Sequence, residues 1–141
     1  MITVSNLSKN YANVKAVESI SFELKDGEVV GFLGANGAGK TTTLKMITGY
    51  LVPTNGEIKV NGLDIVDNTS EIQEMIGYLP ELNPLYTEMR VYDYLEFLGS
   101  IRNIKGSDFK QALSRVVDKC GLSGVVHKVI ADCSKGYKQR I

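Results

Sequence analysis

Apolar and polar side chains alternate through much of the first quarter of the chain. The alternation covers residues 2–7 and residues 17–24, where Val17, Ile20, Phe22 and Leu24 form the apolar side. A period of two is typical of a strand with one buried face. The sequence therefore predicts two strands, separated by a polar loop over residues 8–16 and followed by a tight turn at Asp26 and Gly27.

A nearly continuous apolar run occupies residues 28–34, in contrast to the alternation before it. Short runs of this kind suit a strand that is buried on both faces, as in a parallel sheet. Helix-forming sequence then extends from Gly39 to about Tyr50, and a turn follows at residues 53–56. Residues 57–65 predict a further antiparallel piece, and residues 75–81 predict a short strand that Pro80 ends.

Helical spacing replaces the alternating pattern in the second half of the chain. A short helix is predicted over residues 70–75, with Thr69 or Ser70 as its N-cap. Apolar positions at helical spacing predict a second helix over residues 91–101. A third, amphipathic helix is predicted over residues 107–120, and Gly121 ends it. Strands therefore dominate the first half of the chain and helices the second.

Residues 34–41 match the pattern G-x-x-x-x-G-K-[ST] of a phosphate-binding loop, between a predicted buried strand and a predicted helix. Glycines let backbone N–H groups converge on a phosphate, and the positive end of the following helix favours an anion. Lys40 supplies a point charge for the β- and γ-phosphates, and the Thr41 hydroxyl can coordinate Mg²⁺. The predicted phosphate-binding residues are Gly34, Asn36, Gly37, Ala38, Gly39, Lys40, Thr41 and Thr42.

The phosphate-binding loop does not define the base of the nucleotide. Guanine-selective enzymes usually carry an N-K-x-D element, and the sequence has none. Tyr11, in the predicted loop between the first two strands, offers another way to bind the base, because an aromatic ring can stack on it. Such a stack contributes ~1–3 kcal/mol and tolerates several bases.

Composition and charge narrow the range of partners. Lys plus Arg equals Asp plus Glu at 16 each, so the chain lacks the basic excess of a general nucleic-acid-binding protein. The start of the chain does not predict a signal peptide, and no stretch is apolar enough for a membrane span. Cys120 and Cys133 lack metal-site spacing, which favours two reduced thiols. These features predict a cytoplasmic chain that reaches a membrane only through a partner.

With the loop and Tyr11 identified, the whole chain resembles the nucleotide-binding domain of ATP-binding cassette (ABC) transporters. Tyr11 lies where the family places its adenine-stacking aromatic residue, and Val17 lies where an aliphatic residue lines the same pocket. Residues 34–42 match the family's phosphate loop, with Ala35 where Pro is more usual. The resemblance therefore implies ATP as the nucleotide, together with Mg²⁺.

The Q-loop of the family corresponds to residues 78–81, and Glu81 stands where Gln is usual. The resemblance implies two catalytic residues, Lys40 and Glu81, of which Glu81 approaches Mg²⁺ and the attacking water. A carboxylate is a harder metal ligand than an amide. Residues 78–99 are similar to the exporter branch often called the ABC-2 type, which includes gliding-motility and multidrug or polysaccharide export ATPases.

The signature motif of the family, L-S-G-G-Q followed by x-Q-R, corresponds to residues 133–140. Ser134, Gly136, Gln139 and Arg140 match the pattern, whereas Cys133, Lys135 and Tyr137 replace the usual residues. In the family this motif contacts the γ-phosphate of ATP bound to the other subunit, through a Ser hydroxyl and a Gly amide at a helix N-terminus. The resemblance implies these roles for Ser134 and Gly136.

The implied fold is an α/β P-loop NTPase of the ABC ATPase type. It has an N-terminal antiparallel β subdomain, a parallel core sheet and, from about residue 80 to residue 141, a helical subdomain with the Q-loop and the signature. The implied partners are a second ATP-binding subunit, in a head-to-tail dimer, and a transmembrane permease at the inner (plasma) membrane, with no nucleic acid.

Several family elements expected after the signature are not found in the sequence. These are an apolar strand ending in Asp for Mg²⁺, the Glu that follows it and a switch His. His127 cannot be the switch residue, because it precedes the signature in the sequence. We therefore expect an N-terminal portion of the domain, without the C-terminal part of the core and without hydrolytic competence of its own. We also expect exposed apolar surface and reduced stability.

Two other interpretations remain open from the sequence. The chain could be a shortened module that binds ATP without hydrolysing it and so regulates dimerisation. It could also belong to a soluble ABC ATPase that works without a permease, a class that usually has two cassettes in one chain. The leading hypothesis is the ATP-binding subunit of an ABC-2-type exporter.

Overall fold

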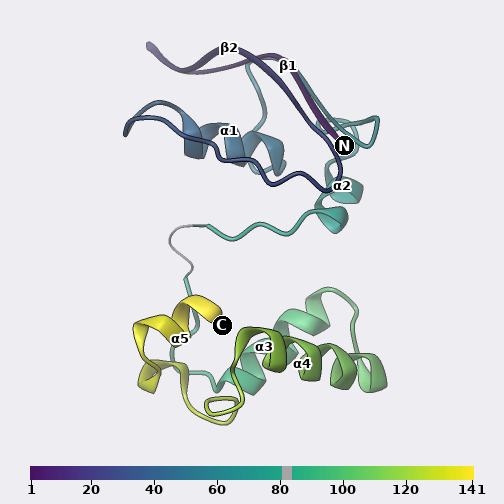
Figure 1. Ribbon diagram of the computed structural model, residues 1–141, viewed down its shortest axis with the longest axis vertical. Coiled ribbons are helices and arrows are strands. Elements are labelled where there is room, and N and C mark those ends of the chain that lie inside the picture. Colours follow the sequence, from purple (N-terminus) through teal and green to yellow (C-terminus); the bar gives the residue numbers. More distant parts are fainter. Residues whose placement is uncertain (81–83) are drawn as a thin grey trace. The chain divides into compact units, whose positions relative to one another are not determined.

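The computed structural model describes residues 1–80 and 84–141 (Figure 1). The chain divides into two compact units, Met1–Tyr78 and Leu79–Ile141, which are described separately. Within the described residues, every helix is too short or too polar to cross a membrane.

An antiparallel sheet forms the base of the first unit. Its strands are β1 (Ile2–Tyr11), β2 (Val14–Leu24), β3 (Asn55–Val60) and β4 (Leu63–Asp64), in the spatial order β2-β1-β3-β4. The strands predicted over residues 2–7 and 17–24 and the antiparallel piece over residues 57–65 are confirmed, but the predicted loop over residues 8–16 is wrong. Strand pairing continues as far as Tyr11 opposite Val14, so only a two-residue turn separates β1 from β2.

Bulges explain how the apolar residues of β1 and β2 reach one face. The residues Asn6 and Ser19 have positive φ angles of 49° and 48°, and the pairing register shifts beside them. A bulge adds one residue to a strand and so moves the following side chain to the other face. Val4 and Leu7, three positions apart, are consequently both buried on the core side.

Two helices pack on the buried face of this sheet. Helix α1 (Lys40–Ile47) runs along the β1–β2 hairpin, as Figure 1 shows, and α2 (Thr69–Met75) follows β4. The core joins Val4, Leu7 and Ile58 of the sheet to Met46 of α1 and Ile72 of α2.

The ends of both helices differ from their predicted positions. Helix α1 ends at Ile47, before the predicted end near Tyr50, because Gly49 has a left-handed φ of 71° and breaks the pattern. The predicted N-cap of α2 is also wrong. Asn68 occupies that position, and the Thr69 hydroxyl instead donates a hydrogen bond to the Ile65 carbonyl oxygen at 2.6 Å.

The buried strand predicted over residues 28–34 and the short strand predicted over residues 75–81 do not form. Residues 28–33 and 76–80 are extended, and no described segment pairs with either of them. An apolar run can adopt extended geometry, but a strand also needs a neighbour to accept and donate its backbone hydrogen bonds. Val29 and Leu33 are 101% and 92% exposed, which confirms the expectation of exposed apolar surface.

The second unit is built from helices, as predicted. It contains α3 (Val91–Ile101), α4 (Gly106–Cys120), a 3-10 turn (Ile130–Asp132) and α5 (Lys135–Arg140). Its core includes Val91 and Tyr94 of α3 together with Leu122, Val125 and Ile130 from the segment between α4 and α5. That segment also lies antiparallel to residues 87–92, since the Val91 amide bonds to the Lys128 carbonyl oxygen and the Ile130 amide to the Met89 carbonyl oxygen.

Truncating Ile58 to alanine should lower the free energy of unfolding by about 2–5 kcal/mol, because its side chain is fully buried between the sheet and the helices. Chemical denaturation monitored by circular dichroism measures the change. Val14→Ala is the matched control, since Val14 is 63% exposed in the same sheet and should shift stability by less than about 0.5 kcal/mol. Equal effects of the two substitutions would contradict this description of the core.

Candidate nucleotide-binding site

The loop of residues 34–39 links the extended apolar segment to the first turn of α1. Gly37 and Gly39 have φ angles of 84° and 86°, in the left-handed region. The Ala38 amide donates to the Ala35 carbonyl oxygen at 3.2 Å, which closes a turn at the tip of the loop. Left-handed glycines next to a tight turn are a backbone geometry that can form an anion-binding concavity before a helix.

Gly39 holds the loop directly against β2. A Cβ at this position would lie 2.4 Å from the Ala16 carbonyl oxygen and 3.0 Å from Cγ2 of Val17. These distances are shorter than any ordinary van der Waals contact, so only glycine allows this approach. The loop and β2 are therefore in direct contact at the N-terminus of α1.

Lys40 is the cation of the loop. Its ammonium group donates hydrogen bonds to the carbonyl oxygens of Gly34 and Ala35, each at 2.7 Å. The long side chain therefore folds back over the loop rather than extending away from it. Phosphate oxygens in the same place would accept stronger, charge-assisted hydrogen bonds from this group.

The first turn of α1 offers amides and hydroxyls without an opposing negative charge. Residues 40–43 include no acidic side chain, so the positive end of the helix is unopposed within that turn. The Thr43 hydroxyl and amide both donate to the Gly39 carbonyl oxygen, at 3.0 Å and 2.8 Å. Thr41 is exposed and Thr42 is half-buried, whereas Thr43 is buried and holds the turn together.

These residues fit a polyphosphate. The donors at the loop and in the first turn of α1 comprise the Lys40 ammonium, backbone amides and threonine hydroxyls. For Mg²⁺, the described residues supply the Thr41 hydroxyl as the predicted ligand. Over residues 1–80 and 84–141, no group of three or more His, Cys, Asp or Glu side chains could by itself hold a metal ion.

The two predicted base-binding residues lie on the first two strands. Tyr11 is the last residue of β1, not a loop residue, and its side chain is 46% exposed. The Lys9 ammonium lies 5.5 Å from the centre of its ring, in a cation–π contact. Val17 is only 6% exposed and packs beneath Gly39, so it supports the loop and offers little surface to a nucleotide base.

The signature residues lie in the second unit, at the start of α5. Ser134 is the N-cap of α5, and its hydroxyl oxygen accepts a hydrogen bond from the Tyr137 amide at 3.4 Å. Its proton therefore remains able to donate elsewhere. Gly136 is exposed, with open space where a Cβ would lie. Glu81, the predicted Q-loop residue, lies outside the described residues.

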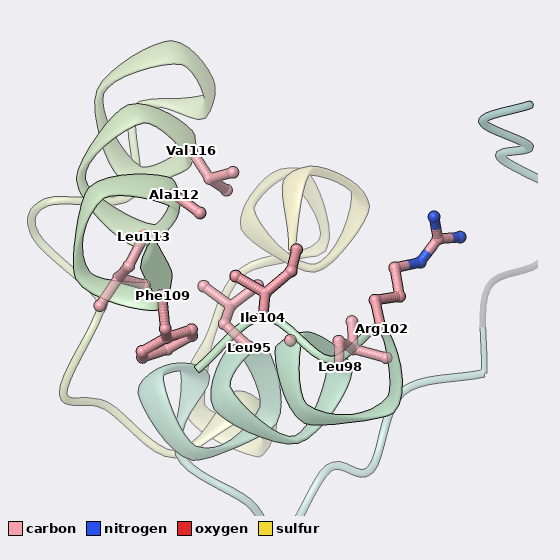
Figure 2. A pocket seen from close by; sticks show the side chains of 9 residues that line it. Leu95, Leu98, Arg102, Ile104, Phe109, Ala112, Leu113 and Val116 are labelled. Atoms are coloured by element: carbon pink, nitrogen blue, oxygen red, sulfur yellow. The ribbon is translucent and has the colours of Figure 1, made fainter. Parts of the chain in front are cut away.

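An apolar groove between α3 and α4 is a feature that the sequence analysis did not identify. Its volume is about 170 Å³. Figure 2 shows Leu95 and Leu98 of α3 facing Phe109, Ala112 and Val116 of α4 across the groove. The helical spacing of these residues predicted amphipathic helices, but it did not reveal that their apolar faces leave a gap.

Comparison with known proteins identifies the family of the chain. The family model described as ABC transporter matches residues 17–141, which include the predicted phosphate-binding loop and the predicted signature. The chain belongs to the ABC transporter family. The ABC ATPase fold, with its antiparallel β subdomain and its helices, follows from the same comparison and from the solved structures.

Three of the similar proteins illustrate this relationship. The "Uncharacterized ABC transporter ATP-binding protein YxlF" of Bacillus subtilis is 36% identical over 141 residues. The "Probable multidrug ABC transporter ATP-binding protein YbhF" of Escherichia coli is 32% identical over 141 residues. The solved structure of cbiO1 from Clostridium perfringens, described as part of the ABC transporter complex cbiONQ, superimposes with a TM-score of 0.83 and 28% identity over 99% of this chain.

The chain is shorter than each of these relatives. Its whole length covers 46% of YxlF and 24% of YbhF, and 99% of its length covers 57% of the cbiO1 chain. The matched region is therefore about half, or less than half, of each related polypeptide.

Proposed function

We propose that this ABC transporter homologue is the ATP-binding subunit of an exporter of the ABC-2 type. The observation that carries the proposal is the phosphate-binding loop, with Lys40 folded over it and Gly39 fixed against β2. In this role the complete protein couples binding and hydrolysis of Mg-ATP to movement of a substrate across a membrane.

The residues of the loop act by binding and orienting the triphosphate. Backbone amides of residues 37–41 donate to phosphate oxygens, and the Lys40 ammonium exchanges its two carbonyl partners for β- and γ-phosphate oxygens. The Tyr11 ring stacks on the base, at the end of the strand that pairs with the strand supporting the loop. Mg²⁺, when bound, neutralises phosphate charge, and the Thr41 hydroxyl and the predicted ligand Glu81 would hold it.

A second subunit completes the proposed ATP site. In a head-to-tail dimer, Ser134 donates its free hydroxyl proton and Gly136 its amide to the γ-phosphate of ATP held by the partner subunit. The cap geometry supports this role, because the Ser134 oxygen accepts from the Tyr137 amide and leaves the proton available. A transmembrane permease then converts closure of the dimer into transport.

Two lines of support favour export over uptake. Residues 78–99 are similar to the ABC-2 branch, and Lys135 gives the signature a form that is frequent there. YbhF, whose name describes a probable multidrug transporter protein, is 32% identical over the whole chain. The substrate class would then be one that leaves the cytoplasm, and the protein would lie at the inner face of the membrane.

A nucleotide titration tests the proposal. The complete polypeptide is titrated with a fluorescent ATP analogue in the presence of Mg²⁺, and unlabelled ATP, ADP and AMP are then used as competitors. We expect ATP and ADP to compete and AMP to compete far more weakly, because the loop binds the β- and γ-phosphates. Equal competition by AMP, or binding of no nucleotide, would refute the proposed function.

Replacing Tyr11 with alanine should weaken ATP binding by ~1–3 kcal/mol through loss of the stack on the base. The effect on inorganic triphosphate should be small, since that ligand has no base to stack. Isothermal titration calorimetry with ATP and with inorganic triphosphate measures the two effects separately. Tyr50→Ala is the matched control, because Tyr50 is 70% exposed in the same unit. Loss of triphosphate binding in the Tyr11 variant would contradict a role in base recognition.

A further inference from the structure

Arg140 ties the signature helix α5 to the end of α4. Its Nη1 donates hydrogen bonds to the carbonyl oxygens of Cys120 and Gly121, at 2.9 Å and 3.3 Å. Its Nε donates to the Gly136 carbonyl oxygen at 3.2 Å. One guanidinium group therefore joins the end of α4 to the first turn of α5, and its partner Cys120 is 20 positions from Arg140 in the sequence.

The C-terminus of α4 is shaped to receive this group. Gly121 is the C-cap, with a left-handed φ of 62°, and a Cβ there would lie 2.9 Å from Arg140 Nη1. The last carbonyl groups of a helix lack partners within it and carry partial negative charge, so a cation at this end is favourable. Gly121 thus allows the left-handed backbone at the end of α4 and also leaves room for the guanidinium of Arg140.

The contacts of Arg140 continue to the start of α5. The guanidinium lies over the Tyr137 ring, with its carbon 4.4 Å from the ring centre. The Tyr137 amide in turn donates to the Ser134 hydroxyl oxygen at 3.4 Å. A continuous series of contacts therefore connects the end of α4, through Arg140 and Tyr137, to Ser134.

Few other contacts fix the direction of α5. The helix has six residues, all of which the structure describes, and none of them is fully buried. Lys138 donates to the Ala131 carbonyl oxygen at 2.8 Å, but that bond reaches only the segment just before the helix. Tyr137 and Ile141 pack at the edge of the core of this unit as partly buried side chains. The bonds from Arg140 to Cys120 and Gly121 thus supply the polar link between α5 and α4.

We propose that Arg140 is a positioning residue that sets the orientation of Ser134 and Gly136 for the ATP of the partner subunit. This inference rests on the proposed function, which gives those two residues their ligand. Its role is to fix α5 relative to α4 through the hydrogen bonds to Cys120 and Gly121. Dimer closure then requires the anchored helix, whereas ATP binding by the loop around Lys40 does not.

The experiment compares two steps of the ATP cycle in the complete polypeptide. Arg140→Met removes the donors and keeps much of the aliphatic length, and Arg140→Lys keeps the charge but loses the planar fork that spans two carbonyl groups. Arg115→Met is the matched control, because Arg115 is an exposed arginine on α4. For each protein, ATP affinity is measured by fluorescence titration, and dimerisation by analytical ultracentrifugation with a non-hydrolysable ATP analogue.

We expect Arg140→Met to raise the dimer dissociation constant about tenfold or more, from loss of hydrogen bonds made by a charged group. Its affinity for ATP should stay within about twofold of the unaltered protein. The dimer dissociation constant of Arg140→Lys should lie between those of the unaltered protein and Arg140→Met, since an ammonium can reach one carbonyl group but cannot bridge both. Arg115→Met should match the unaltered protein in both measurements.

Three outcomes would overturn the inference. One is unchanged dimerisation of a folded Arg140→Met protein. Another is an equal loss of ATP affinity and dimerisation, in Arg140→Met or in the better-tolerated Arg140→Lys, which would indicate a general folding defect. The third is an Arg115→Met defect as large as that of Arg140→Met. Failure of the proposed function is distinguishable, because the unaltered protein would then bind no ATP at all.

Discussion

Replacing Lys40 with alanine is expected to weaken Mg-ATP binding by about two orders of magnitude, which corresponds to ~3 kcal/mol. The ammonium is already held over the loop by the carbonyl oxygens of Gly34 and Ala35, both at 2.7 Å. It therefore needs little reorganisation to meet β- and γ-phosphate oxygens. Its removal leaves the anion with backbone amides and hydroxyls but without a neutralising charge.

Isothermal titration with Mg-ATP measures this loss, and Lys45→Ala provides the matched control. Lys45 lies in the last turn of the same helix, on an exposed side, so its removal changes the net charge equally without touching the loop. The Lys45 variant should bind ATP within about twofold of the unaltered protein. Equal losses in the two variants would show that overall charge, and not the loop, determines affinity.

Replacing Gly39 with alanine is expected to disrupt the loop itself. The residue has a φ of 86°, and its Cβ would lie 2.4 Å from the Ala16 carbonyl oxygen. Left-handed geometry alone costs a non-glycine residue about 1–2 kcal/mol. Because the contact is with backbone, the loop must also move away from β2. We expect ATP binding to be lost and the free energy of unfolding to fall by about 2 kcal/mol or more.

Gly62→Ala is a close control for that substitution. Gly62 has the same φ of 86°, in the turn between β3 and β4, but a Cβ there would meet nothing within 4 Å. Both variants carry the backbone strain, and only the Gly39 variant carries the collision. Denaturation and ATP titration of the pair therefore isolate the contact with β2. If Gly62→Ala lost ATP binding as well, strain alone would explain the effect and the close approach would not matter.

Local patterns in the sequence predicted the elements whose partners are close along the chain. The β1–β2 hairpin and α4 with its Gly121 cap depend on neighbours within a few dozen residues, so alternation, helical spacing and a glycine stop were sufficient. The strand predicted at residues 28–33 was wrong for a physical reason. Apolar composition measures a tendency to be buried, whereas a strand also requires a second backbone beside it.

The residues of the candidate site also separate into those set by local sequence and those set by contacts between distant segments. The candidate phosphate-binding loop could be proposed from the sequence because its glycines, Lys40 and Thr41 lie within eight consecutive residues. The position of Tyr11 in a strand could not, because β1 and β2 stay paired as far as Tyr11 and Val14, beyond the stretches in which apolar residues alternate. Arg140 matched a motif, but its hydrogen bond to Cys120 depends on how two helices meet, which no local pattern encodes.

The exposed run at residues 28–33 also bears on how this chain behaves at high concentration. Val29 and Leu33 project from extended backbone whose amides and carbonyl groups pair with no described segment. Such a segment is a template on which another copy can add a strand, and a short apolar stretch of high β-propensity is prone to aggregation through this pairing. Only Glu28 carries a charge within it. The same residues that lead into the candidate phosphate-binding loop thus favour misassembly of the chain at high concentration.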